Sequence, residues 1–104
     1  MSLNVTVNKN HGSLEFLLSG RFDFHSNQVF RTAYERGLKE AESGGGIVVD
    51  LSGVDYMDSS ALGMLLLFKE RADEENRMIT LTNCQETVRE VLEIVNFGKL
   101  FSIH

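Results

Sequence analysis

Two adjacent serines stand among acidic residues in the stretch 48–68, VVDLSGVDYMDSSALGMLLLF. Ser59 and Ser60 follow Asp55 and Asp58, and a leucine-rich run that is long enough for a helix comes next. Aspartate and serine are preferred at helix N-caps, because their side-chain oxygens accept hydrogen bonds from the first free backbone N–H groups. One interpretation is that these residues only cap the helix, and composition and spacing alone favour it.

The second interpretation is that one of the two serines is a chemical switch. A helix N-terminus holds a phosphate well, since its free N–H groups point outward and the helix end carries about half a positive charge. Phosphorylation would add about −1.5 to −2 charges beside Asp55 and Asp58. Such an acidic spot would repel one partner and attract another.

The residues after the serines predict a helix over 59–74. Its core-facing stripe at helical spacing consists of Ala61, Leu62, Leu65, Phe68 and Ala72. Gly63 and Leu67 fall opposite this stripe, with Met64 and Leu66 on its flanks. Either the helix is buried on more than one side, or Gly63, Met64 and Leu67 form an exposed apolar ridge for a partner. A glycine inside a helix costs about 1 kcal/mol relative to alanine, so Gly63 invites a packing or docking reason.

The rest of the chain predicts a mixed sheet covered by helices. Alternating apolar residues indicate an antiparallel hairpin over 3–7 and 14–19, in which Leu14, Phe16 and Leu18 share a buried face. The other predicted elements are a helix over 26–42 with Ser26 as its N-cap, a strand over 47–51 covered on both faces, a strand over 78–83, a helix over 86–96 and a closing strand over 99–103. The order β-β-α-β-α-β-α-β indicates a single α/β domain over 1–104 with right-handed crossovers.

The overall composition disfavours several classes of function. Ten basic against fifteen acidic residues give a net charge of −5, whereas direct nucleic-acid binding needs a basic surface. Cys84 is the only cysteine, which rules out an internal disulfide. The longest apolar run, MLLLF, falls far short of the roughly 20 residues of a membrane span. With no signal-like start, the expected setting is the cytoplasm.

Catalytic and metal chemistry find little support in the residues. A serine hydrolase needs a base beside its nucleophile, and the histidines are His11, His25 and His104. His25 could approach Ser59 in space, but a surface or capping histidine is the better interpretation. The histidines and acids lack metal-ligand spacing, and the glycines at 44–46 lack the Lys-Ser/Thr of a phosphate loop. We therefore expect no enzyme, no metal and no cofactor.

The segment VVDLSGVDYMDSSALG resembles the central motif of the STAS-domain anti-sigma-factor antagonists. In that motif a strand ends in D-L, a short turn follows, and M-D-S-S/T-G-L-G opens a helix. The stretch LSGRFDFHS, with Gly20 and Asp23, matches the family's G-x-x-D segment, and TVREVLEIVNFGKLFSI resembles its C-terminal portion. The resemblance implies a STAS-like single domain, and its MDSS-LG core is the specific part.

The resemblance also implies a function and its residues. In the family, the serine after the motif aspartate is phosphorylated by a kinase that doubles as an anti-sigma factor, and a metal-dependent phosphatase removes the phosphate. By position, the phosphoacceptor is Ser59, Asp58 is its acidic neighbour and Asp23 lies close by. The expected partner-binding residues are Asp23, Asp58, Ser60, Gly63, Met64 and Leu67. Ala61 departs from the pattern, where glycine is usual.

The unphosphorylated form would therefore sequester an anti-sigma factor and release a sigma factor, and phosphorylation would weaken the complex. The family also includes proteins that are not switches, such as subunits of lipid transporters. The alternative is therefore a non-switching STAS adaptor in a lipid-transport or other regulatory complex. The intact Asp58-Ser59 pair favours the switch.

Overall fold

The computed structural model describes residues 2–10, 13–41 and 44–104. Their strands are β1 (Asn4–Asn10), β2 (Ser13–Phe22), β3 (Ile47–Met57), β4 (Ile79–Thr82) and β5 (Ser102–Ile103). The helices are α1 (Asn27–Glu40), α2 (Ser59–Glu74) and α3 (Glu86–Ile94), with short 3-10 turns η1 (Phe24–Ser26) and η2 (Phe97–Lys99). The predicted order of strands and helices is confirmed.

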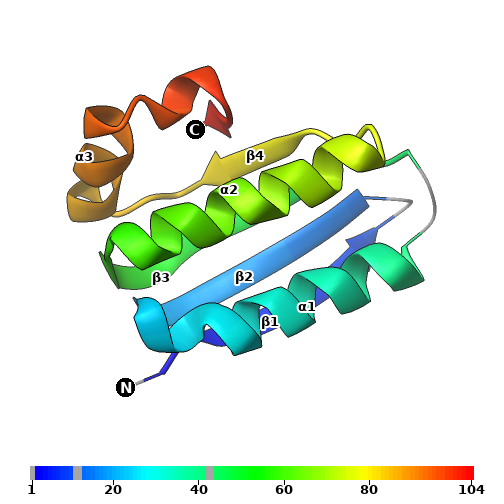
Figure 1. Cartoon of the computed structure of the whole chain (residues 1–104), viewed down its shortest axis with the longest axis horizontal. Coiled ribbons are helices and arrows are strands. Elements are labelled where there is room, and N and C mark those ends of the chain that lie inside the picture. Colours follow the sequence, from blue (N-terminus) through cyan, green and yellow to red (C-terminus); the bar gives the residue numbers. More distant parts are fainter. Residues whose placement is uncertain (1, 11–12, 42–43) are drawn as a thin grey trace.

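The strands form one mixed sheet in the order β1-β2-β3-β4-β5, and α1 and α2 lie side by side across it (Figure 1). β1 pairs antiparallel with β2, and each later pair of neighbours is parallel. Every parallel connection steps one strand in the same direction, so right-handed crossovers place the helices on one face of the sheet.

Side chains along the strands alternate between a buried face and a less covered one. Leu14, Phe16 and Leu18 of β2 are buried together, as predicted. In β3, by contrast, Val48 and Asp50 are only half-buried between fully buried neighbours. The prediction that this strand is covered on both faces is therefore wrong. The cause is that the helices pack on one side of the sheet only.

Aromatic rings hold α1 and α2 against the sheet. The Phe68 ring of α2 stacks on Tyr34 of α1, with centroids 4.6 Å apart, and meets the Phe16 ring of β2 edge-on at 5.3 Å. Gly37 lets α1 come this close, because a Cβ there would lie 2.9 Å from Cζ of Phe16. This packing fixes the two helices that carry the candidate site.

The start of the first helix differs from the prediction over 26–42. The chain forms η1 first, and α1 then runs over Asn27–Glu40. Ser26 occupies the N-cap position of α1, but its side chain makes no capping hydrogen bond there. The serine is buried, and its Oγ donates instead to the carbonyl oxygen of Arg21 at 3.0 Å.

The C-terminal elements are shorter than predicted. The helix expected over 86–96 ends at Ile94, and Asn96 then adopts a left-handed conformation with φ 59°. The closing strand expected over 99–103 is reduced to Ser102–Ile103, because η2 takes up residues 97–99.

A buried arginine ties the loops before β3 and β4 together. The side chain of Arg77 is fully buried. It donates from Nη1 to the carbonyl oxygen of Gly45 at 2.8 Å and from Nε to Oε1 of Glu75 at 3.1 Å. These contacts fasten the entry to β3, at the opposite end of that strand from Ser59.

Candidate functional site at the amino end of α2

Two parallel strands bring the predicted aspartates together. Phe22, at the end of β2, lies opposite Met57, at the end of β3. The N–H of Asp58 donates to the carbonyl oxygen of Phe22 at 3.3 Å, so Asp23 and Asp58 leave the sheet at the same edge. β3 runs to Met57, past its predicted end at residue 51, and this extra length carries the chain to the site.

Asp58 caps α2 and also joins it to η1. Its Oδ1 accepts a hydrogen bond from the N–H of Ala61 at 3.0 Å, and its Oδ2 accepts one from the N–H of Phe24 at 3.2 Å. The backbone of Asp58 is extended, with φ −109° and ψ −177°, as the N-cap position requires. α2 then begins at Ser59, where it was predicted to begin.

The two serines are therefore not needed as caps. Ser59 is the first residue of α2 and is exposed, and Ser60 is half-buried. Within the described part of the chain, neither hydroxyl has a hydrogen-bond partner. The first N–H groups of a helix also lack intrahelical acceptors. An exposed, unbonded hydroxyl in this position is accessible to the active site of another protein.

Asp23 organises η1, the neighbouring turn. Its Oδ1 accepts a hydrogen bond from the N–H of His25 at 3.0 Å, and its Oδ2 accepts one from Nε of Arg21 at 3.3 Å. Partial burial alone would raise the pKa of Asp23, but these two hydrogen bonds and the positive charges of the Arg21 and His25 side chains outweigh it and lower the pKa below its ordinary value. Ser26 completes a capping box, because its Oγ accepts from the N–H of Asp23 at 3.0 Å.

A hollow of about 430 Å³ lies beside the serines, between η1, the start of α1 and the exposed side of α2. Its lining residues are Phe24, Asn27, Ser60, Gly63, Met64 and Leu67. Four of the predicted partner-binding residues therefore share one concave surface. Asp23 and Asp58 hold the turn and the helix start that form its near end.

The burial of α2 follows neither interpretation of its sequence completely. Gly63 is exposed and Leu67 is 54% exposed, so one side of the helix does face solvent. Met64, predicted in the exposed ridge, is only 6% exposed, and Leu62, predicted in the core stripe, is half-buried. Met64 lies on a flank of the stripe, close enough for its flexible side chain to join the core.

Phe24 was missed by the sequence reasoning. Its side chain is 70% exposed and lines the hollow. The residue sits in a short 3-10 turn without periodicity, so the only available signal was an aromatic side chain between Asp23 and His25. Among the described residues nothing lies within 4 Å of where a Cβ of Gly63 would be, so packing against them does not explain this glycine.

The remaining candidates lie away from the serines or carry no further chemistry. The His25 ring contacts the Phe24 ring, with centroids 5.3 Å apart, and His25 lines a groove on the other side of α1. Asp55 is exposed on β3. Cys84 is half-buried, and burial raises the pKa of its thiol.

The described residues contain no group of three or more metal-ligating side chains that could hold an ion. In the same residues, no helix has the length and apolar character needed to span a membrane.

Comparison with solved structures identifies the same fold elsewhere. The anti-sigma factor antagonist SpoIIAA in its unphosphorylated form matches with a TM-score of 0.72 and 19% identity, over 97% of this chain and 87% of that one. The phosphorylated form of SpoIIAA from Bacillus matches with a TM-score of 0.68 and 20% identity, over 97% and 91%.

Comparison of sequences finds relatives that match over nearly the whole chain, among them the following two. A STAS-domain containing protein of Pseudomonas aeruginosa (strain UCBPP-PA14) is 45% identical over 99% of both chains. The anti-sigma-B factor antagonist of Bacillus subtilis (strain 168) is 26% identical over 99% of this chain and 92% of its own length. The family model described as "Mlab, STAS domain" matches residues 5–102. The chain therefore belongs to the STAS-domain family.

Proposed function

We propose that this protein is a phosphorylation-controlled antagonist of an anti-sigma factor, acting in the cytoplasm, with Ser59 as the phosphoacceptor. The observation that carries the proposal is the different hydrogen bonding of Asp58 and Ser59 at the start of α2. Asp58 does the capping, and the hydroxyl of Ser59 stays exposed and unbonded beside an apolar hollow. The similarity to proteins named anti-sigma factor antagonists supports this role.

The partner is an anti-sigma factor that is also a serine kinase, and a metal-dependent serine phosphatase reverses the modification. The hydroxyl of Ser59 must enter the kinase active site, so the binding and modification surfaces overlap. Phe24 and Leu67 supply the large exposed apolar contacts around that surface. Gly63 leaves room for the partner to approach the helix backbone closely.

Phosphorylation weakens this complex through charge and desolvation. A phosphate adds about −1.5 to −2 charges, and Asp23, Asp55 and Asp58 already stand at this end of the sheet. Burying the added charge against the partner becomes costly. The fold itself survives, because the helix N-terminus interacts favourably with an anion. SpoIIAA, a protein of the same fold, exists in both states.

The first experiment asks whether Ser59 is modified. The protein is purified from its native cells, and phosphate occupancy is measured by peptide mass spectrometry for the wild type, Ser59→Ala and Ser60→Ala. We expect occupancy in the wild type and Ser60→Ala, and none in Ser59→Ala. Ser60 is the matched control because it is adjacent and its hydroxyl is also unbonded in the described structure. Unchanged occupancy in Ser59→Ala would overturn the assignment.

The second experiment asks what the switch controls. Ser59→Ala and Ser59→Asp proteins are used in parallel for affinity capture from the same cells. The partner should be recovered with Ser59→Ala and reduced with Ser59→Asp, which imitates the phosphate only in part because a carboxylate carries less charge. Calorimetry with the purified partner then compares phosphorylated and unphosphorylated protein. Equal affinities would exclude the switch and leave the STAS adaptor without a switch as the function.

A further inference from the structure

The strand at the end of the sheet has a free edge. β1 pairs with β2 on one side, and no other strand in the described part of the chain lies on its outer side. A terminal strand presents unpaired N–H and C=O groups that can pair with another chain. Folded proteins usually block such edges with proline, β-bulges or charged side chains.

β1 carries few of these blocking features. The chain contains no proline. The pairing with β2 runs without a register shift from Asn4 opposite Ser19 to Asn10 opposite Ser13, so no bulge bends the strand away. The only charged side chain in β1 is Lys9, and its Nζ lies 3.2 Å from Oε1 of Glu40 on α1. This edge is therefore open along seven residues.

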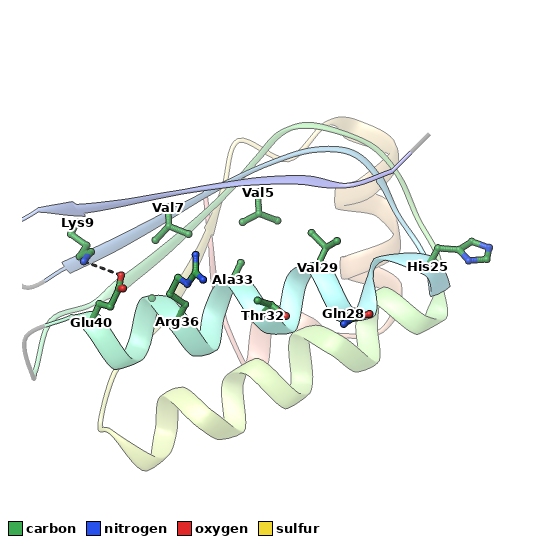
Figure 2. A pocket seen from close by; sticks show the side chains of 11 residues that line it. Val5, Val7, Lys9, His25, Gln28, Val29, Thr32, Ala33, Arg36 and Glu40 are labelled. Atoms are coloured by element: carbon green, nitrogen blue, oxygen red, sulfur yellow. Dashed lines mark hydrogen bonds and ion pairs between the residues drawn. The ribbon is translucent and has the colours of Figure 1, made fainter.

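A groove lined by both apolar and charged side chains follows the same edge, between β1 and α1 (Figure 2). Val5 and Val7 point from β1 toward the helix, while Val29 and Ala33 point from α1 toward the strand (Figure 2). Val29 is 45% exposed, and both strand valines are only half-buried. The sheet thus ends with apolar side chains that a further strand would cover.

We propose that the occupant is a second copy of this chain, with its β1 paired antiparallel to the first about a two-fold axis. A two-fold axis uses the same surface of both copies: where residue i of one copy lies opposite residue j of the other, residue j of the first copy lies opposite residue i of the second. If the valines of both copies are to lie on the helix-covered face, the two-fold axis must pass through a residue position and not between two residues. The registers that also set a valine of one copy opposite a valine of the other are centred on Val5, Thr6 or Val7.

Only the register centred on Thr6 satisfies both apolar pairing and strand length. A centre at Val7 would set Val5 opposite Lys9, and a centre at Val5 would pair only residues 4–6 of each strand. With Thr6 opposite Thr6, each Val5 faces a Val7, and each Asn4 faces an Asn8. Pairs of β-branched residues and Thr–Thr pairs are favourable across strands.

The position of the groove is compatible with this pairing. Lys9, already paired with Glu40, stays outside the rows of opposing residues within the two strands. The groove shares no lining residue with the hollow beside Ser59, so the two surfaces can be occupied at once. Five paired residues a side make a small interface, so the dimer forms at high protein concentration. This inference does not depend on the proposed function.

A cysteine cross-link tests the register directly. In a Cys84→Ser background, Thr6→Cys places two thiols opposite each other, within the Cα separation of about 4.4–6.8 Å that a disulfide accepts. Asn8→Cys is the matched control, since its counterpart lies four residues, about 14 Å, further along the strand. We expect a cross-linked dimer with Thr6→Cys and none with Asn8→Cys under mild oxidation.

Sedimentation over a range of concentrations tests the dimer itself. The exposed position of Thr6 allows charge changes without loss of the fold, which a thermal melt verifies. Thr6→Lys and Thr6→Glu should each raise the dimer dissociation constant about fivefold, because like charges then lie opposite each other. An equimolar mixture of the two variants should restore the wild-type dissociation constant, because opposite charges then face each other. A wild type that stays monomeric throughout overturns the proposal, and so does a dimer that Thr6→Cys fails to cross-link. Phosphate occupancy at Ser59 is unaffected in either case.

Discussion

The two turns that leave the sheet at the same edge use similar residues differently. In the first, Asp23 caps η1, and the nearby Ser26 is buried with its hydroxyl bonded on both sides. In the second, Asp58 caps α2, and the adjacent Ser59 is exposed and free of bonds in the described structure. Serine beside a helix start is thus structural in one turn and available in the other. The difference lies in burial and not in residue type.

The largest expected effect comes from removing the cap that joins the two turns. Asp58→Ala loses the hydrogen bond to Ala61 and the one to Phe24. An N-cap contributes about 1 kcal/mol and a further hydrogen bond about as much, so the free energy of unfolding should fall by about 2 kcal/mol. Chemical denaturation measures it. Asp58→Asn is the intermediate case, because its single side-chain oxygen can accept from the N–H of Ala61 or of Phe24 but not from both. It should therefore lose about 1 kcal/mol, and an equal loss in both variants would contradict this account of the two hydrogen bonds.

The helices that follow the two turns each contain a glycine, and these should respond in opposite directions. In α1, Gly37→Ala places a methyl 2.9 Å from Phe16 and should cost about 1–2 kcal/mol through overpacking. In α2, Gly63→Ala meets open space and should stabilise the fold by up to about 1 kcal/mol. Thermal melts compare the two. Gly63→Ala should also weaken partner binding despite the firmer fold, and unchanged binding would remove Gly63 from the contact surface.

Substitution of Ser26 should lower the stability of the fold, whereas substitution of Ser59 should remove the proposed phosphoacceptor and leave the stability nearly unchanged. Ser26→Ala leaves the carbonyl of Arg21 and the N–H of Asp23 without their hydroxyl partner and should cost about 1–2 kcal/mol. Ser59→Ala should change stability by less than about 0.5 kcal/mol, as exposed substitutions usually do. Urea denaturation provides both values. A Ser59→Ala variant that is as unstable as Ser26→Ala would erase the distinction between the two turns.

The smallest effect concerns pH. The pKa of Asp23 is lower in the folded chain than its ordinary value of 3.8. Such a carboxyl stabilises the fold above its unfolded pKa, and this contribution disappears as the pH falls through the folded pKa. Asp23→Asn should therefore be less stable than the wild type at neutral pH, and the gap should close below pH 3.8. Denaturation at several pH values tests this. If the difference in stability between the wild type and Asp23→Asn did not change with pH, the charge of Asp23 would not be its cause.

The sequence predicted correctly those features that depend on neighbouring residues in the chain, such as helix capping and the alternation of apolar side chains along a strand. The limits of α2 follow from an acidic cap and a helical stripe, and the buried row on β2 follows from alternation. The role of Ser26 was mistaken because its hydroxyl turns back to Arg21, a contact made by the fold of the turn and not by helix capping. Phe24 was missed because its exposure depends on where η1 meets α2.

The burial of strands and helix flanks also depends on tertiary structure. The apolar start of β3 looks the same in a sequence whether helices cover one face or two, and here the direction of the crossovers decides it. Met64 is similar: a flank position on a helical wheel becomes buried or exposed according to what packs beside it.

The bond between Asp58 and the backbone of Phe24 spans 34 residues of sequence. A partner that contacts both Phe24 and Ser59 would therefore bind a surface that forms only when the sheet is assembled. A short peptide carrying the MDSSALG segment lacks the Phe24 side of that surface. In the proposed interaction, copies of the chain that have not folded would not bind the partner, because they lack this assembled surface.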